Sequence, residues 1–393
     1  MNGGSNMKKV LVACDSFKGS LTSSEICEIF KERVERFGLD VVIDGVPVAD
    51  GGEGTLSAVQ QALGWQIVCD GDRKDIDLDF DNYYLLNGDC AFIESAKTSG
   101  FFKLIGYIDS EYDNIKCRML DTVLHASTYG TGLQILKAIN KGAKHIYLSL
   151  GGTCTNDCGF GALTALGFRF LNENGEIVPP IPLELGTIRA YTFVGDPKIL
   201  KTKFTLISDV DNTLLGKNGA TLFYGKQKGL ADGYARVVEN NMAQFADFLE
   251  DATGKSIRNI NGTGGAGGLG AGIYAFFNAK FVRGIDFILD ALKIDEHLVQ
   301  CDAVITGEGK IDNQTFHGKL VNGIIDRAKK YSVPVYVLAG SSRLSPEELS
   351  GHGVLGMQTL LYYAESVKES MRCAKGYARF CAEELLKQII SEN

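Results

Sequence analysis

The chain has 393 residues, of which 45% are hydrophobic and 22% charged, and its formal net charge is −8. This composition is typical of a soluble globular protein, and the length predicts about two domains. The negative charge argues against nucleic acid or an anionic membrane as a partner. No segment approaches the ~20 apolar residues that a membrane helix requires, and the ten cysteines without a CxxC pair indicate a reducing cytosol.

The first part of the chain alternates strands and helices. Residues 8–14 form a short apolar run that predicts a buried strand, and Thr22 or Ser23 can cap a helix that runs to about Arg36. A second strand is expected over 40–48, after which the segment DGGEGT (50–55) opens another helix. Strand, helix, strand and helix joined by short loops predict a parallel α/β sheet.

The pattern changes in the middle of the chain. Residues 83–86 and 90–94 flank Asn-Gly-Asp and predict a β-hairpin. Helices are expected over 131–141 and 230–249, and strands over 145–150 and 204–210. This mixed order predicts an inserted mixed α/β domain over residues 67–261.

The regular alternation returns after residue 262. Helices are expected over 268–277, 285–292 and 320–330 and at the C-terminus through Ile390; strands are expected over 303–306, 333–339 and 357–363. Residues 1–66 and 262–393 are therefore expected to form one discontinuous, Rossmann-like parallel-sheet domain. The inserted domain splits it, and we expect the active site in the cleft between the two domains.

Six loops share one pattern, in which an apolar strand is followed by glycine with Asp, Asn, Ser or Thr. They are DSFKGS (15–20), DGGEGT (50–55), GGTCTND (151–157), DVDN (209–212), GTGGAGGLGAG (262–272) and TGEGKID (306–312). Each alone has a structural explanation, because turns use glycine and helices use capping acids. Six together predict a ligand cleft, since ligands of open α/β sheets bind beyond the carboxyl ends of the strands.

The glycine cluster contains G-x-G-x-x-G at Gly265, Gly267 and Gly270. No convincing buried strand precedes it and no suitable acidic partner follows about 20 residues later, so a nicotinamide site is disfavoured. Two interpretations stay open: the backbone cradles a phosphate at a helix N-terminus, or the glycines allow a helix to pack closely. The absence of GxxxxGK[ST] disfavours a P-loop kinase.

Three acidic loops suggest two other classes of enzyme. FTLISDVDNTLL (204–215) fits the D-x-D-x-T-L signature of haloacid dehalogenase-type phosphatases, in which the first acid, here Asp209, attacks phosphorus. GEGKID resembles the metal-binding loop of that superfamily, although Glu308 and Ile311 stand where Asp and Asn are expected. GGEGT resembles the G-G-D-G-T loop of diacylglycerol, NAD and phosphofructo-kinases, which touches ATP phosphates and helps to hold magnesium.

Taken together, the loops resemble the bacterial glycerate kinase family, the two-domain kind that is not P-loop based. The motifs that carry the resemblance are ACDSFKGSLTS, VPVADGGEGT, STYGTG, GGTCTNDCGFGALTALG, DVDNTLLGKNGAT, YGKQKG, GAGGLGAG and TGEGKIDNQTFHGK. They occur in the order of the family and cover nearly the whole chain from Lys8. Lys310 stands where the family commonly has Arg, which keeps the charge but loses bidentate geometry.

The resemblance implies phosphorylation of D-glycerate with ATP as co-substrate and Mg²⁺ as cofactor, at the 2-hydroxyl in this bacterial branch. It implies glycerate and ATP as the small-molecule partners and a cytoplasmic enzyme; the sequence makes no prediction about the oligomeric state. A phosphatase using Asp209 and a ligand-binding relative without turnover remain the alternatives.

Phosphoryl transfer needs positioning, charge neutralisation and a group that accepts the hydroxyl proton. Lys18 is the candidate for a phosphate or carboxylate contact, and Asp209 or Asp157 can accept the proton, although either can instead cap a turn. The candidate magnesium ligands are Asp50, Glu53, Glu308 and Asp312. The residues expected to bind substrate or nucleotide are Asp15, Ser16, Gly51, Gly52, Asn156, Asn212, Lys228, Gly265, Gly267, Gly268, Lys310 and Lys319.

Overall fold

The structure, a computed structural model, describes residues 7–17, 19–48, 56, 59–60, 63–69, 83–100, 120, 122–316 and 320–391. The chain divides into two compact units: residues 1–51, 57–64 and 285–393 form the first, and residues 52–56 and 65–284 form the second. The fold is α/β, as predicted. Within the described residues, no helix combines the length and the apolar character needed to cross a membrane.

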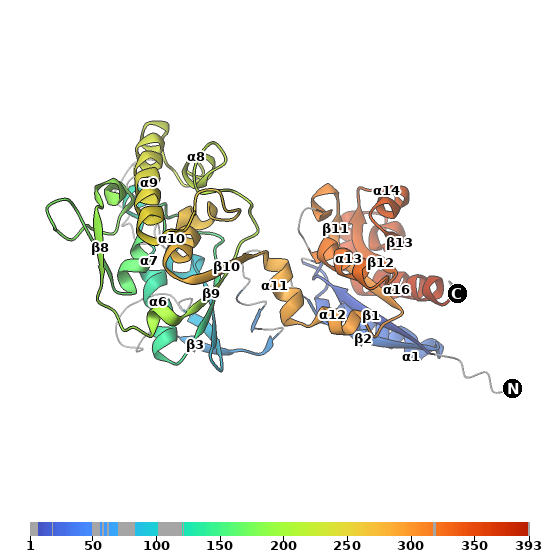
Figure 1. Ribbon diagram of the computed structural model, residues 1–393. Helices are drawn as coiled ribbons and strands as arrows, with labels where there is room; N and C mark the ends of the chain where they lie inside the picture. The colour runs from blue at the N-terminus through green and yellow to red at the C-terminus, as the bar shows by residue number, and fades with distance from the viewer. Residues whose placement is uncertain are drawn as a thin grey trace. The chain divides into compact units, whose positions relative to one another are not determined.

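A five-stranded parallel sheet in the order β13-β12-β11-β1-β2 is the centre of the first unit. In Figure 1 the N-terminal strand β1 (blue) lies beside β11 (orange), which is about 290 residues away in the chain. The elements of this unit are β1 (Lys8–Cys14), α1 (Ser23–Phe37), β2 (Val41–Gly45), α11 (Gly284–Ala291), α12 (Ile294–Leu298), β11 (Ala303–Ile311), η4 (Asn313–Phe316), α13 (Leu320–Lys330), β12 (Val335–Ser342), α14 (Pro346–Gly351), β13 (Val354–Thr359), η5 (Leu360–Tyr363), α15 (Val367–Arg372) and α16 (Ala374–Ser391).

Strand β1 and helix α1 form where the sequence predicts them. Val10 to Cys14 are completely buried, as expected for a central strand of a parallel sheet covered on both faces. Helix α1 begins after Thr22, whose side chain accepts a hydrogen bond from the backbone N–H of Glu25, while the Glu25 carboxylate accepts one from the N–H of Thr22. This capping box fixes the point at which the chain leaves the loop after β1.

Strand β11 is longer than predicted. The sequence predicts a strand over 303–306 followed by a loop, whereas the structure continues the strand through Lys310 to Ile311. The reason is pairing with β12, in which Glu308 lies opposite Ala339 and Lys310 opposite Ser341. The polar end of TGEGKID therefore lies on a strand, and alternate side chains point to opposite faces of the sheet.

The second unit contains a six-stranded mixed sheet in the order β10-β9-β6-β5-β4-β3 and a small β7-β8 hairpin. The four strands β10, β9, β6 and β5 are parallel, and the predicted hairpin of β4 and β5 is confirmed as antiparallel. The elements are β3 (Gln66–Cys69), β4 (Tyr83–Asn87), β5 (Cys90–Glu94), α3 (Ala96–Ser99), α6 (Tyr129–Asn140), β6 (His145–Ser149), α7 (Phe160–Ala165), β7 (Phe168–Leu171), η1 (Pro182–Thr187), β8 (Ala190–Phe193), η2 (Ile199–Lys201), β9 (Lys203–Ile207), α8 (Ala220–Tyr224), α9 (Asp232–Thr253), η3 (Gly265–Gly268), α10 (Leu269–Phe276) and β10 (Asn278–Val282).

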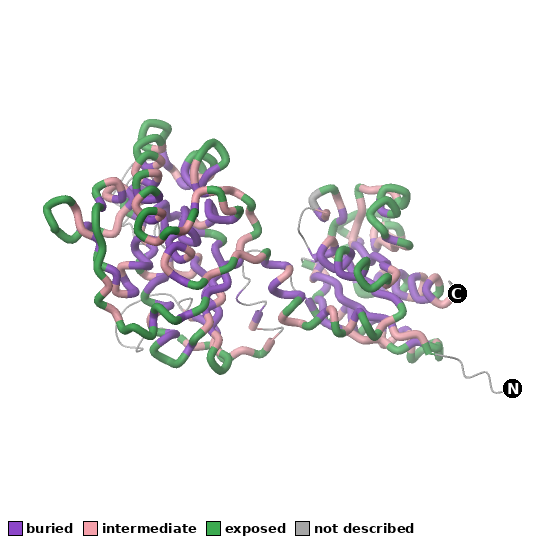
Figure 2. Tube along the Cα trace, in the orientation of Figure 1, coloured by how far each residue is buried: buried purple, intermediate pink, exposed green. Residues whose placement is uncertain are grey.

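The sequence predicts that the chain returns to the first domain at residue 262, but this residue lies inside the second unit. Helix α10 packs on α7 and α9, and β10 extends the sheet by parallel pairing with β9. The boundary between the units therefore falls at Gly284 and Ile285. In Figure 2 buried residues (purple) follow the central strands of each sheet, so each unit has its own core.

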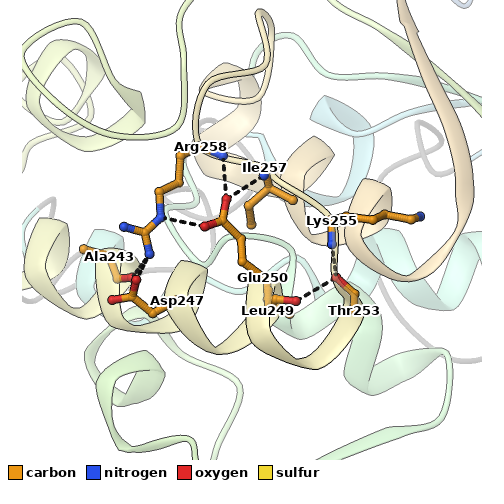
Figure 3. A network of polar contacts seen from close by, with 8 residues as sticks. All are labelled: Ala243, Asp247, Leu249, Glu250, Thr253, Lys255, Ile257 and Arg258. Atoms are coloured by element: carbon orange, nitrogen blue, oxygen red, sulfur yellow. Dashed lines mark hydrogen bonds and ion pairs between the residues drawn. The ribbon is translucent and has the colours of Figure 1, made fainter.

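The connection from α9 to the glycine cluster is held by a polar network, shown in Figure 3. The Glu250 carboxylate accepts hydrogen bonds from the backbone N–H groups of Ile257 and Arg258, and the Arg258 side chain pairs with both Glu250 and Asp247. Lys255 donates to the carbonyl oxygens of Tyr274 and Phe277, each at 2.8 Å, at the end of α10. These contacts fix both ends of the segment that carries the glycines.

Candidate functional site

The strand order of the first unit creates a topological switch point. In chain order the strands are β1, β2, β11, β12 and β13, so the observed order corresponds to the doubly wound arrangement 2-1-3-4-5. β1 pairs with β2 on one side and with β11 on the other. Ligands of such sheets bind where the strand order reverses, which is here at the carboxyl ends of β1 and β11.

A cavity of about 500 Å³ lies at this point. Its polar lining comes from the loop after β1, the ends of β11 and β12, and one residue of α15: Asp15, Ser16, Ser20, Glu308, Lys310, Asp312, Ser341 and Ser370. Its apolar lining comes from Phe17, η5 and α15: Leu360, Leu361, Val367 and Met371. Five of the predicted site residues, Asp15, Ser16, Glu308, Lys310 and Asp312, thus lie in one cavity.

Hydrogen bonds hold the polar side of this cavity in place. The backbone N–H of Asp15 donates to the carbonyl oxygen of Gly307 at 2.8 Å, which ties the loop after β1 to β11. The Asp15 carboxylate, 7% exposed, accepts a hydrogen bond from the Ser16 N–H at 2.7 Å. The Lys310 ammonium lies 3.0 Å from the Asp312 carboxylate. The cavity therefore offers both positive and negative charge within reach of a ligand.

Asp157, in the second unit, has a side chain whose partners are other groups of the protein. Its side chain is completely buried, and its carboxylate accepts four hydrogen bonds: from the N–H and hydroxyl of Thr128 and from the N–H groups of Gly159 and Gly161. Burial raises the pKa of Asp157 above its ordinary value, and these hydrogen bonds oppose that rise. The carboxylate caps the starts of α6 and α7, which is the structural alternative that the sequence left open.

Lys228 and Asn156 are buried close to the same loop. The Lys228 ammonium donates to the carbonyl oxygen of Thr155 at 2.8 Å, and burial lowers the pKa of Lys228 to about 8. Asn156 is completely buried, and neither polar atom of its side chain has a hydrogen-bond partner within the described part of the chain. An unsatisfied buried amide costs about 1–3 kcal/mol, so Asn156 is the most unusual polar residue of this region.

Protein backbone fills the space around the glycine cluster. A Cβ on Gly267, which has a φ of +64°, would lie 1.8 Å from the carbonyl oxygen of Thr155, and a Cβ on Gly268 would lie 3.0 Å from the Cα of Cys158. Gly265, Gly267 and Gly268 are all buried. The close-packing interpretation therefore accounts for Gly267 and Gly268, because a side chain at either position would collide with the loop 151–158, whereas a Cβ on Gly265 would lie 3.1 Å from the hydroxyl oxygen of Ser208.

Asp209 and Asn212 follow β9. Asp209 is exposed, and its carboxylate accepts a hydrogen bond from the N–H of Gly284 at 2.7 Å. The Asn212 side chain donates to the carbonyl oxygen of Asn218 and accepts from the Tyr224 hydroxyl, each at 2.6 Å. Of the two candidate proton acceptors, Asp209 is thus the one with a solvent-accessible side chain.

Several predicted residues lie outside the described residues: Lys18, Asp50, Gly51, Gly52, Glu53 and Lys319. The loop DGGEGT and two of the four predicted lysines, Lys18 and Lys319, belong to this group. Among the residues that the structure does describe, no three Asp, Glu, His or Cys side chains are grouped as a metal site.

The sequence analysis missed two parts of the cavity. Ser341 comes after the predicted strand 333–339 and Gly340, so the pattern of glycine with a polar residue after a strand could have found it. The apolar lining from η5 and α15 carries no such signal, because Leu361, Val367 and Met371 are ordinary core-type residues in sequence. Only the position of their elements after β13 brings them to the cavity.

Residues 10–390 match the Glycerate kinase family. The chain is 35% identical to the glycerate kinase of Halalkalibacterium halodurans, with 93% of this chain and 94% of the relative covered. It is 32% identical to the glycerate 2-kinase of Escherichia coli, with 95% of each covered. The crystal structure designated glycerate kinase 2 from Salmonella typhimurium LT2 superposes with a TM-score of 0.76 at 31% identity and covers 98% of this chain and 99% of its own.

Proposed function

The chain belongs to the glycerate kinase family, and on that premise we propose that it transfers the γ-phosphoryl group of ATP to the 2-hydroxyl of D-glycerate in the cytosol. The observation that carries the proposal is the family match, which spans residues 10–390 and so includes all the loops discussed above. The similarity to a relative described as a glycerate 2-kinase supports the 2-hydroxyl as acceptor. Every cysteine in the described part of the chain is a free thiol, which is in keeping with a reducing compartment.

Phosphoryl transfer depends on positioning and on charge neutralisation. We propose that Lys18 and Lys310 balance the charge of the phosphates. Lys310 is half-exposed in the cavity of the first unit, where its ammonium is accessible to a ligand. Asp209 is the proposed acceptor of the hydroxyl proton, because its carboxylate is exposed, whereas four donors already surround the carboxylate of Asp157.

Glycerate offers a carboxylate and two hydroxyl groups for recognition. We propose that Asn156, Asn212 and Lys228 contact it, of which Asn156 has the strongest physical argument. Its buried amide has no partner among the described residues, and a polar ligand group or an ordered water would remove that cost.

The chemistry of the cavity fits a magnesium ion. Magnesium is usually held by one or two carboxylates together with phosphate oxygens and waters, and Glu308 and Asp312 both line the cavity. These two residues, with Asp50 and Glu53, are the proposed ligands. When bound, the ion would neutralise charge on the transferring phosphate.

The phosphatase alternative requires its two acidic motifs to act at one site. The D-x-D-x-T-L segment follows β9 of the six-stranded sheet, and GEGKID belongs to β11 of the five-stranded sheet. The motifs therefore follow strands of different sheets in different units. The same separation applies to Asp209 and Lys310 in the proposed kinase, so it is the family match that favours the kinase.

A coupled assay for ADP release with D-glycerate and ATP tests the proposal. We expect ADP formation that depends on D-glycerate and on Mg²⁺, and phosphorus NMR of the product should show the phosphate on the 2-oxygen. Hydrolysis of phosphate esters without any ADP release would support the phosphatase instead. Binding of glycerate without turnover would support the non-catalytic alternative.

A pair of matched substitutions separates the two candidate proton acceptors. Asp209→Asn should lower kcat at least about 100-fold, or about 2.7 kcal/mol in the barrier, with little change in unfolding free energy. Asp157→Asn should instead lower the unfolding free energy by roughly 3 kcal/mol, because buried donors lose part of their acceptor. Urea unfolding and steady-state kinetics on both variants measure these effects. A near-normal kcat in Asp209→Asn would remove Asp209 from the chemistry.

A further inference from the structure

The cavity of the first unit has two chemically different sides. Asp15, Glu308, Lys310 and Asp312 line the side formed by the ends of β1 and β11. The opposite side comes from η5 and α15, which contribute Leu360, Leu361, Val367 and Met371 together with the single hydroxyl of Ser370. A ligand that fills the whole cavity must therefore carry charged groups at one end and an apolar surface at the other.

The apolar side is open to solvent. Val367 is 60% exposed and Met371 is 44% exposed, although both line the cavity. The Cε of Met371 lies 3.3 Å from the position of a Cβ on Gly19, so α15 packs directly against the loop after β1. Exposed apolar side chains that converge on a cavity mark a binding surface more often than scattered ones do.

The two substrates of a glycerate kinase differ in how well they match this lining. Glycerate carries oxygen on every carbon and has no apolar face to place against Val367 and Met371. A nucleoside triphosphate has a planar base at one end and phosphates at the other. The volume of about 500 Å³ lies within the range of about 300–1,000 Å³ that is usual for pockets that bind small molecules.

We propose that this cavity is the nucleotide site, with the base against Leu361, Val367 and Met371 and the phosphates on the side of Ser16 and Lys310. This inference rests on the proposed function, because it assigns one of the two substrates of that reaction. The polar side lies at the switch point of the sheet, where the backbone of open α/β folds receives anionic groups. The apolar side then supplies the surface on which the base stacks and from which water is displaced.

Paired polar substitutions test the apolar side without adding charge. The double variant Val367→Asn/Met371→Gln changes two partly exposed residues and should leave the fold intact, which urea unfolding checks. We expect the Kd for ADP, measured by calorimetry on the full chain without glycerate, to rise at least about tenfold. The KM for ATP should rise similarly, and the KM for D-glycerate should stay within about twofold.

The matched control is Val299→Asn/Leu355→Gln. These residues belong to the same unit, are 65% and 57% exposed, and do not line the cavity. The control should leave the Kd for ADP within about twofold of the unchanged protein.

Three results would overturn the assignment: an unchanged Kd for ADP in the cavity variant, an equal loss in the control, or no ADP binding by the unchanged protein. Results that contradict the proposed reaction can be distinguished from results that contradict the nucleotide site. A chain that binds ADP in this cavity but forms no phosphoglycerate contradicts the proposed reaction and leaves the nucleotide site standing. A chain that forms phosphoglycerate with an unchanged KM for ATP in the cavity variant contradicts only the nucleotide site.

Discussion

The loops of the two units share their residue types but differ in what surrounds them. In the first unit, Glu308, Lys310 and Asp312 line a cavity of about 500 Å³, and Lys310 is half-exposed. In the second unit, Asp157 is completely buried and its carboxylate accepts four hydrogen bonds from protein groups. The comparison teaches that a glycine-rich acidic loop can either hold a ligand or hold other loops, and that burial distinguishes the two.

The difference between buried and cavity-lining residues can be measured by the effects of substitutions on stability and on ligand binding. Substitutions of Asp157 and Gly267 in the second unit should mainly change the free energy of unfolding, since these buried residues contact protein atoms. Substitutions in the cavity of the first unit should mainly change ligand affinity and turnover.

The largest effect is expected at Gly267. Its φ of +64° is a left-handed conformation, and a Cβ there would lie 1.8 Å from the carbonyl oxygen of Thr155. Gly267→Ala should therefore lower the free energy of unfolding by roughly 4 kcal/mol, as measured in urea, because it adds backbone strain and forces two loops apart.

Gly254 supplies the matched control for this substitution. It lies in the same unit with a φ of +69°, but nothing lies within 4 Å of its Cβ position. Gly254→Ala should cost only about 1 kcal/mol, which is the price of the left-handed conformation alone. Equal losses in the two variants would mean that close packing does not explain the glycine cluster.

The next effect concerns the buried Lys228. Burial lowers its pKa from 10.5 to about 8, and its neighbours Cys154 and Asp157 oppose this shift. The unfolded chain then keeps the proton to a higher pH than the folded protein does, so folding releases a proton between these two values. The contribution of Lys228 to stability therefore rises with pH from about 8 to about 10.5.

The variant Lys228→Met has no such proton. Between about pH 7 and about pH 10, the unfolding free energy of the unchanged protein should increase relative to that of Lys228→Met by about 2 kcal/mol. Urea unfolding at both pH values measures the difference. Lys226→Met, which removes an exposed lysine two residues earlier, is the control. A difference between the unchanged protein and Lys228→Met that stays constant with pH would show that the ammonium is not held in a desolvated site.

The sequence predicts local features of the fold well. Strand β1 and helix α13 have the predicted bounds, because apolar runs, helical spacing and caps are encoded within each segment. The sequence does not predict the end of β11, which depends on pairing with β12, or the boundary at Gly284, which depends on pairing of β10 with β9. Pairing between distant segments leaves no local pattern to read.

The candidate site residues can also be found from local sequence, whereas their roles depend on contacts with distant parts of the chain. The sequence selects Asp157 and Asp209 as candidates because both follow strands in polar loops. Partners far along the chain distinguish the two carboxylates. The N–H of Thr128, 29 residues away, donates to Asp157, and the N–H of Gly284, 75 residues away, donates to Asp209. The sequence left both options open, and tertiary contacts give Asp157 its capping role.

The smallest effect on stability is expected at Lys310, on the other side of the comparison. The side chain is 48% exposed and its ion pair with Asp312 is on the surface of the cavity, where such pairs contribute little. Lys310→Ala should change the free energy of unfolding by less than about 0.5 kcal/mol. If the cavity binds the phosphates of the nucleotide, the same variant should raise the Kd for ADP about tenfold, because a charge-assisted contact is lost. Lys310→Arg keeps the charge and should recover most of that affinity. A clear loss of stability in Lys310→Ala with an unchanged Kd would place Lys310 among the structural residues, and the contrast between the two units would then fail at this position.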